Sequence, residues 1–265
     1  MAALNEITPA HLMRLIGTPQ CPAIVDVCID EDFACDPHLI SSAFRHSHKD
    51  LDGLLDKVLS RDVVVVCQKG LKLSQGVAAY LRAKGIDAQI VTGGNIGWRD
   101  AGLPRVPAAC IPSPLWVTRH RPKIDRIACP WLIRRFVNPK AQFLFVPPSD
   151  VAGVAERFEA TPFDTDIPPW THVGDKCTFD VMVETFGLAH PALDALALIV
   201  RSADTDRHDL APQAAGLLAI SVGLSRMFRD DTQQLDAGMM VYDALYRWAR
   251  DGQDEGHDWP KAATP

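Results

Sequence analysis

A cysteine followed by a short basic loop is the feature of this sequence that most directly suggests chemistry. Four consecutive valines, Val63 to Val66, lead into Cys67, and a helical pattern begins at Ser74. A cysteine between a strand end and a helix start lies close to loop amides and to the positive end of the helix dipole. Both favour the thiolate over the thiol. The pattern therefore predicts that Cys67 is a nucleophile.

The residues after this cysteine predict a site for a small anion. Gly70 permits the positive φ that a ring of inward-pointing amides requires, and Lys69 and Lys72 add positive charge. A buried, unreactive cysteine beside two exposed lysines is the alternative interpretation. The candidate substrate-binding residues are the six that follow the cysteine: Gln68, Lys69, Gly70, Leu71, Lys72 and Leu73.

Nitrogen, sulfur and oxygen donors recur in the second half of the chain. The residues concerned are His172, Cys177, Asp204, Asp206 and His208. If they converge, such donors suit a borderline transition metal, which is the one cofactor that the sequence suggests. His172 and Asp204 are the first candidates for its ligands. A turn near Gly174, a helix start at Cys177 and a solvated loop over 204–209 explain the same residues without a metal, and no HxxxH or CxxC spacing is present.

The elements around Cys67 alternate between strand and helix. Strands are expected at 24–27, 63–66 and 88–91, and a helix is expected from Ser74 to Lys84. The valine strand is apolar at every position, as a central parallel strand buried on both faces requires. This order predicts an α/β fold in which helices flank a parallel sheet.

Helical patterns dominate the second half. Strands are expected at 115–117 and 143–146, and the expected helices cover 126–136, 191–202, 212–228 and 232–250. Asp230 or Asp231 is the predicted N-cap of the last helix, and Gly252 lies just beyond its end. Four prolines between positions 104 and 114 predict an extended linker. We therefore expect two domains, residues 1–111 and 112–255, the second a mostly helical α+β domain.

The first part of the chain resembles the rhodanese sulfurtransferase family. The segment from Cys67 to Ser74 is similar to the family's Cys-x-x-Gly-x-Arg-Ser loop. Further matching segments are Ile24–Val27, Ile40–Ala43, Gly93–Trp98 and Ala101–Pro104, so that the similarity extends over about residues 5–107. The resemblance implies that Cys67 takes sulfur from a small donor such as thiosulfate and carries it as a persulfide to an acceptor thiol or cyanide. It also implies that loop amides from Gln68 to Leu73 hold the terminal sulfur.

The loop departs from the family pattern at three positions. Lys72 replaces the arginine, Leu73 is an insertion before Ser74, and Cys28 stands where an arginine often follows the Asp-Val strand. The loop also differs from the Cys-x5-Arg loop of cysteine phosphatases, because the sixth residue after the cysteine is leucine. No guanidinium in this loop can grip a phosphoryl group with two hydrogen bonds.

The second part resembles the chromate-resistance protein family. The segments that carry this resemblance are Trp116–Arg119, Asp125–Phe136, His172–Phe179 and Ala203–Asp206. It implies a role in chromate tolerance and leaves three alternatives to a sulfurtransferase open: a non-catalytic sensor of chromate or another oxyanion, a transcriptional regulator, and a metal-dependent enzyme. Residues 111–140 carry seven basic groups and one acid, which fit either an oxyanion site or a solvated face paired with the acidic remainder.

Length and composition limit the remaining classes. The chain has 265 residues, of which 47% are hydrophobic and 23% charged, and this excludes a disordered or fibrous protein. No segment reads as a membrane span or a secretory leader, and the seven cysteines are scattered without a CxxC pair. With a net charge of −6 we expect a soluble cytoplasmic protein that binds neither a membrane nor nucleic acid.

Overall fold

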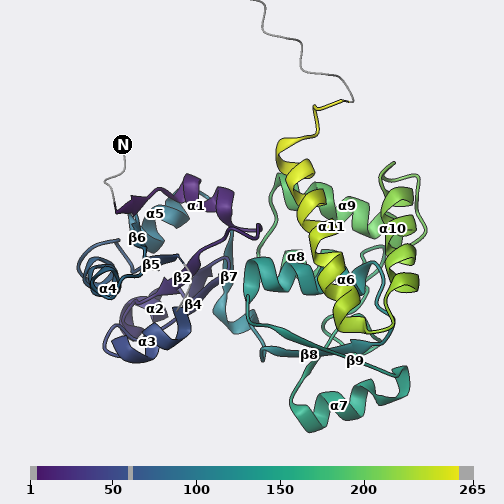
Figure 1. Cartoon of the computed structure of the whole chain (residues 1–265), viewed down its shortest axis with the longest axis horizontal. Coiled ribbons are helices and arrows are strands. Elements are labelled where there is room, and N and C mark those ends of the chain that lie inside the picture. The colour runs from purple at the N-terminus through teal and green to yellow at the C-terminus, as the bar shows by residue number, and fades with distance from the viewer. Residues whose placement is uncertain (1–4, 59–61, 257–265) are drawn as a thin grey trace, which may run out of the picture.

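The computed structural model describes residues 5–58 and 62–256, and within them the chain forms two parallel sheets, each covered by helices (Figure 1). The first four residues of the predicted N-terminal domain lie outside the described residues. The predicted fold class is confirmed: a parallel sheet flanked by helices precedes a mostly helical second half. None of the helices in the described ranges is both long and apolar enough to cross a bilayer.

The first sheet has five parallel strands in the order β1-β6-β5-β2-β4. Their bounds are β1 Glu6–Ile7, β2 Ala23–Asp26, β4 Ala43–Arg45, β5 Val63–Val66 and β6 Ala88–Val91. The strand predicted at 24–27 lies one residue earlier, and the other two predicted strands are confirmed as β5 and β6. Because β5 lies in the middle of the sheet, Cys67 follows its central strand.

Helices cover both faces of this sheet. Helices α1 (Pro9–Leu15) and α5 (Gly94–Asp100) pack against the face that carries Val64 and Val66. Helices α3 (Leu51–Val58) and α4 (Lys72–Ala83) pack against the face that carries Val63 and Val65. The short helix α2 (Asp30–Cys35) follows β2. The valine strand is thus buried on both sides, as its sequence predicts.

Helix α4 begins at Lys72, two residues before the predicted start at Ser74. The reason is that the Leu71 carbonyl already accepts the amide of Gln75 at 2.9 Å, which closes the first helical turn inside the loop. The loop after Cys67 is therefore shorter than the sequence suggests, and the amides of Lys72 and Leu73 belong to the first turn of the helix.

The proline-rich segment is part of the fold, and its interpretation as a linker is wrong over 105–107. Strand β7 (Arg105–Pro107) pairs antiparallel with β3 (His38–Ile40), and a 3-10 turn, Ala108–Cys110, follows. Pro107 lies at the end of this two-stranded edge, where a missing N–H costs little. The predicted domain boundary near residue 112 falls between this turn and the first strand of the second sheet and stays a prediction.

The second sheet has three parallel strands, β10-β8-β9, and its two faces are covered differently. The bounds are β8 Leu115–Arg119, β9 Gln142–Val146 and β10 Thr161–Pro162. Helix α7 (Val151–Phe158), preceded by a 3-10 turn over Pro148–Asp150, covers the face that carries Val117. Trp116 and Phe143 join the large apolar cluster on the opposite face, where the helical layer lies (Figure 1).

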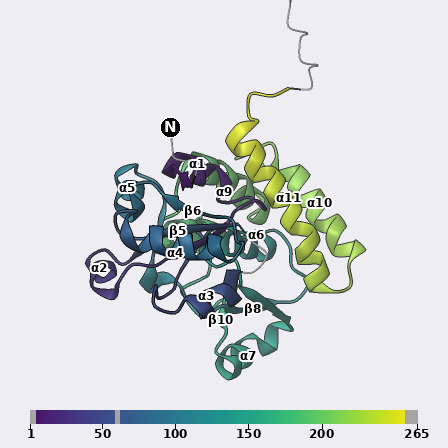
Figure 2. The same ribbon diagram turned by 60° about the vertical axis from the view of Figure 1, so that its left-hand side comes forward.

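The helical layer holds α6 (Asp125–Leu132), α8 (Thr178–Thr185), α9 (Pro191–Asp204), α10 (Ala214–Met227) and α11 (Asp231–Asp251). Helices α10 and α11 lie side by side in both views (Figure 2). The last three predicted helices are confirmed within two residues, and the Asp230 carboxylate caps α11 by accepting from the Gln233 amide at 2.8 Å. The helix predicted over 126–136 is α-helical only as far as Leu132. A π-helical segment, Ile133–Val137, continues it and keeps Ile133 and Phe136 on the buried side.

Candidate functional site

Cys67 is buried at the carboxyl end of the central strand, beside a single hydroxyl group. Its Sγ lies 3.3 Å from the Oγ of Ser74, in the first turn of α4. The Ser74 hydroxyl donates its hydrogen to the Leu71 carbonyl at 3.1 Å, so its oxygen is left to accept from the Cys67 thiol. A thiolate at this position would instead receive the hydroxyl hydrogen after a rotation about one bond. Ser74 can thus serve both protonation states of Cys67.

The turn between β6 and α5 holds the cysteine loop by its carbonyl groups. The amides of Asn95 and Ile96 donate to the carbonyls of Cys67 and Gln68, each at 3.0 Å. In a trans peptide the following N–H points away from the carbonyl, so the amides of Gln68 and Lys69 point away from α5. Within the described part of the chain, the backbone amides of residues 68–73 donate no hydrogen bond. The loop therefore presents unpaired donors.

Two glycines permit this close packing of loop on turn. Gly70 has a φ of 68° and Gly94 a φ of 59°. A Cβ added to Gly94 would overlap the carbonyl oxygen of Cys67 and the backbone nitrogen of Gly70. The Gly93-Gly94 pair is thus required for the conformation of the loop as well as for its own turn.

Charged residues surround the loop. Lys69 and Lys72 are exposed and form no ion pair with any described residue. A cavity of about 140 Å³ opens beside Gln68. Arg99 of α5 and Arg105 of β7 also line it, and they pair with Asp36 at 3.9 and 2.6 Å. Neither arginine is among the candidate residues predicted from the sequence.

Cys28 is a second thiol beside this loop. Its Sγ accepts from the Asn95 side chain at 3.4 Å, and Asn95 also donates to Asp26 at 2.8 Å. Burial, together with the neighbouring Asp26 carboxylate and Cys67, raises the pKa of the Cys28 thiol. Cys28 therefore stays protonated at neutral pH, so it is a poor competitor for the nucleophilic role predicted for Cys67.

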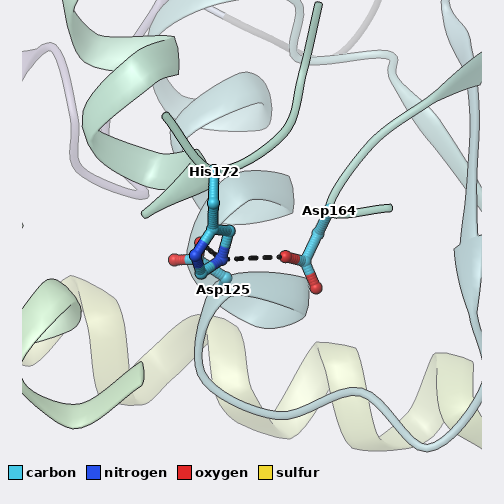
Figure 3. A group of neighbouring side chains, drawn as sticks. All are labelled: Asp125, Asp164 and His172. Carbon is cyan, nitrogen blue, oxygen red and sulfur yellow. Dashed lines mark ion pairs between the residues drawn. The ribbon is translucent and has the colours of Figure 1, made fainter. Parts of the chain in front are cut away.

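A second group of titratable side chains lies in the other half of the chain (Figure 3). Asp125 begins α6, Asp164 follows β10, and His172 lies in the segment before α8. The Nε2 of His172 is 3.6 Å from Asp125 Oδ2 and 3.4 Å from Asp164 Oδ1. Each of the three residues offers one ligand atom, and these three atoms lie within 4.8 Å of one another. We call Asp125, Asp164 and His172 the acidic cluster.

Asp204 flanks the acidic cluster. Its Oδ2 lies 3.2 Å from the same histidine nitrogen, and its Oδ1 accepts from the Asp125 amide at 3.5 Å. The structure thus brings together the two residues predicted as metal ligands, His172 and Asp204, and their role as ligands stays a prediction. Asp206 and His208 pair with each other at 3.4 Å and form no described contact with the cluster.

The electrostatics of the cluster are set by burial and by three like charges. Burial, with the charges of Asp204 and Asp164, raises the pKa of Asp125 well above its usual range. Burial also raises the pKa of Asp204. A hydrogen bond to Asp164 and the charges of the other carboxylates raise the pKa of His172 to about 9. Burial acts against ionisation of Asp164, but His172 and two arginines lower its pKa overall. Asp125, Asp204 and His172 therefore retain protons to higher pH than the free groups do, and Asp164 loses its proton more readily.

Asp125 and Asp164 are functional candidates that the sequence analysis missed. Asp125 is the single acid among seven basic residues in the stretch 111–140, which is the one local signal that marks it. Asp164 has a positive φ of 49°, which a sequence does not display.

Cys177 is buried at the start of α8, where its amide donates to Asp180 at 3.1 Å, so the alternative of a helix start is confirmed. Most of the basic stretch pairs with acids: Arg119 and Arg126 with Asp164, Arg134 with Asp236 and Arg135 with Asp243.

Solved structures of rhodanese-type proteins are similar to the N-terminal part. A rhodanese-related protein from Thermoplasma volcanium is 19% identical over 38% of this chain and 97% of its own, with a TM-score of 0.34. A rhodanese-like domain protein from Staphylococcus aureus is 30% identical over 36% of this chain and 91% of its own, with a TM-score of 0.32. A thiosulfate sulfurtransferase from Pseudomonas aeruginosa is 24% identical over 38% of this chain and 19% of its own, with a TM-score of 0.34.

The second half is similar to a curated bacterial protein and matches a family. Protein ChrB of Cupriavidus metallidurans is 36% identical over 132 residues, which are 49% of this chain and 39% of that protein. The chain thus spans well under two thirds of that relative's length. Residues 116–249 match the family described as ChrB, C-terminal domain. This range takes in half of the chain and contains the whole acidic cluster, and the protein therefore belongs to the ChrB C-terminal domain family.

Proposed function

We propose that the N-terminal part is a sulfurtransferase that carries sulfane sulfur on Cys67. The observation that supports this most directly is the loop of residues 68–73, whose amides are unpaired in the described structure while its first carbonyls are bound to α5. Unpaired amides at a helix start stabilise a negatively charged sulfur. Lys69 and Lys72 are exposed beside them and attract an anionic donor.

The reaction proceeds in two displacements at sulfur. The Cys67 thiolate attacks the outer sulfur of thiosulfate; a new S–S bond forms, the old one breaks, and sulfite leaves with the electron pair. A nucleophile such as cyanide, or a thiolate, then attacks the terminal sulfur of the persulfide and returns Cys67 as a thiolate. The Ser74 hydroxyl donates to the thiolate before and after transfer, and the loop amides hold the terminal sulfur in between.

Arg99 and Arg105 supply the anion contacts that the loop lacks. Both line the cavity next to Gln68, and Asp36 already neutralises part of their charge. We assign to them the departing sulfite, while the terminal sulfur stays with the backbone. This division accounts for a loop with Lys72 in place of the family's arginine.

Intact mass after incubation with thiosulfate tests the proposal. The wild-type chain is expected to gain one sulfur atom, which peptide mapping places on the Cys67 peptide, and Cys67→Ser is expected to gain none and to lose thiosulfate:cyanide activity. Cys110→Ser is the matched control, because Cys110 lies in the 3-10 turn after β7, outside the lining of the cavity next to Gln68, and should leave loading unchanged. A sulfur adduct that persists in Cys67→Ser would refute the assignment.

We further propose that this activity serves chromate resistance in a reducing compartment such as the cytoplasm. Membership of the ChrB C-terminal domain family supports the association. Cells that carry Cys67→Ser in place of the wild-type gene should then be more sensitive to chromate. Equal tolerance of the two strains would favour the alternative of a non-catalytic oxyanion sensor or regulator.

A further inference from the structure

Three carboxylates converge on one imidazole nitrogen in the acidic cluster and its neighbour Asp204. Asp125, Asp164 and Asp204 all approach one imidazole nitrogen, at 3.6, 3.4 and 3.2 Å. Arg119 and Arg126 reach only the outer oxygen of Asp164, at 3.1 and 3.3 Å. Several carboxylates gathered inside a protein are unfavourable unless protons or a cation balance them.

Asp125 supplies an independent sign of a missing partner. Its side chain is fully buried, and its Oδ1 has no hydrogen-bond partner among the described residues. The other oxygen, Oδ2, accepts from the Phe179 amide at 3.3 Å and faces His172 (Figure 3). A buried carboxylate oxygen without a hydrogen-bond partner is unfavourable, so its place beside two other ligand-type side chains calls for a cation.

We propose that Asp125, Asp164 and His172 bind one divalent transition-metal ion. Donor atoms that lie about 2.1 Å from one ion are about 3.0 to 3.4 Å apart when they occupy neighbouring positions. The His172 nitrogen is 3.4 and 3.6 Å from its two carboxylate partners, so small adjustments bring all three donors onto a common ion. We assign Asp204 a positioning role, because its Oδ1 accepts from the Asp125 amide while its Oδ2 lies 3.2 Å from the histidine nitrogen.

The donor set selects the class of metal. One imidazole nitrogen with carboxylate oxygens suits Mn²⁺, Fe²⁺ or Zn²⁺, whereas Ca²⁺ and Mg²⁺ prefer oxygen alone. Among the described residues, the group of ligand-type side chains contains no thiol, which argues against the soft, thiolate-bound metals.

The surroundings resemble those of an open metal site. Thr178 donates to Asp164 Oδ1 at 3.2 Å and Arg119 to its Oδ2, so this carboxylate is held in place from outside. Three protein ligands leave at least one coordination position free. The His172 side chain is 42% exposed, so water or a substrate reaches the ion from that side.

Metal binding to the full chain tests the proposal. Chelator-treated protein is titrated by calorimetry with Mn²⁺ and with Zn²⁺, and bound metal is counted by mass spectrometry after dialysis. We expect one ion per chain. His172→Ala and Asp125→Asn should weaken binding more than about 100-fold, because loss of an outer partner alone costs 10–100-fold. Asp204→Asn should fall within that smaller range.

The segment that contains Asp204 also offers a pair of residues for matched controls. Asp206 and His208 contact each other at 3.4 Å without touching the cluster, so Asp206→Asn and His208→Ala should bind metal like the wild type. Cys67→Ser should also bind normally, which separates this proposal from the sulfurtransferase. His172 is partly exposed, so His172→Ala should stay folded even if Asp125→Asn does not. Wild-type protein without saturable binding, equal affinity in His172→Ala, or tighter binding of Mg²⁺ than of Mn²⁺ and Zn²⁺ would each overturn the inference.

Discussion

Two histidines in this chain occupy opposite electrostatic surroundings. His172 lies among three carboxylates, which raise its pKa to about 9. His190, the residue before α9, is part-buried against Tyr246, and burial lowers its pKa. Its Nδ1 lies 2.8 Å from the Leu188 carbonyl and its Nε2 lies 3.1 Å from the Tyr246 hydroxyl. A neutral ring that donates through Nδ1 and accepts through Nε2 satisfies both contacts.

The surroundings of His190 predict a loss of stability in mild acid. Its folded pKa lies below the unfolded value of 6.5, so the unfolded chain takes up the proton first as the pH falls. The contribution of His190 to the free energy of unfolding should therefore be fully present above about pH 6.5 and should decrease as the pH falls below that value. His172 has the opposite shift, and its contribution is lost only as the pH rises towards 9.

Thermal unfolding of metal-free protein at about pH 7.5 and 5.5 measures this effect. His190→Asn keeps a donor near the Leu188 carbonyl but does not titrate. Between these two pH values, the melting temperature of the variant should fall by less than that of the wild type. An equal or larger loss in the variant would show that His190 does not carry the acid sensitivity.

At the scale of elements, the cysteine loop depends on a turn from a different part of the chain. Gly94 begins α5 and approaches the backbone of both Cys67 and Gly70. The loop's carbonyls are held by the amides of Asn95 and Ile96 at the same helix start. The conformation of the loop is therefore a property of two βα units rather than of the cysteine segment alone.

The main effect of Gly94→Ala should be overlap with the cysteine loop, which disrupts the sulfur site. Backbone strain should make the smaller contribution. Gly102 has a similar φ, 65° against 59°, and its added Cβ would meet nothing within 4 Å. We expect Gly102→Ala to cost about 1–2 kcal/mol, since left-handed backbone disfavours any Cβ. Overlap with the loop should add about 1–3 kcal/mol in Gly94→Ala.

Chemical denaturation and the thiosulfate mass gain compare these two variants. Only Gly94→Ala should lose sulfur loading while still folded, because only there does the new methyl group displace the loop amides. Normal loading in Gly94→Ala would mean that the packing of the turn on the loop is not needed for the chemistry.

At the scale of the whole molecule, the two halves share one apolar core. Leu12 of α1 and Ile16, which directly follows this helix, belong to the same buried cluster as Phe136 and Tyr246. A Cβ on Gly17 would lie 2.5 Å from the Phe136 ring, and the Ser42 amide donates to the Phe136 carbonyl. Arg250 of α11 also donates to the Arg14 carbonyl at 2.7 Å. The N-terminal half and the half that matches the ChrB C-terminal domain family are thus packed together and not merely linked.

This shared core predicts that both halves unfold together. Phe136→Ala removes a fully buried ring and should lower the free energy of unfolding by about 3–5 kcal/mol. Urea titrations followed by tryptophan fluorescence and by alkylation of Cys67 report mainly on the second and the first half. Both midpoints should fall by the same amount. A shift confined to the fluorescence transition would show that the halves are energetically independent.

Local patterns determined much of what the sequence predicted. The valine strand, the two strands beside it and the last three helices follow from hydrophobic periodicity and caps, which act over a few residues. The position of Cys67 after the central strand follows from the same patterns. Helix α8 was anticipated only as a helix start at Cys177, and the π-helical turn after Leu132 was not predicted, because neither has a strong local signal.

Only the tertiary structure decided which side chains meet. Asp125, Asp164 and His172 come from three separate segments, and no spacing rule joins them. Arg99 and Arg105 likewise come from α5 and β7 to line the cavity that Gln68 also lines. Local sequence patterns fix the conformation of neighbouring residues, whereas contacts between distant segments depend on how whole elements pack. For this reason the position of Cys67 at the end of a strand could be predicted from the sequence, whereas the acidic cluster appeared only with the fold.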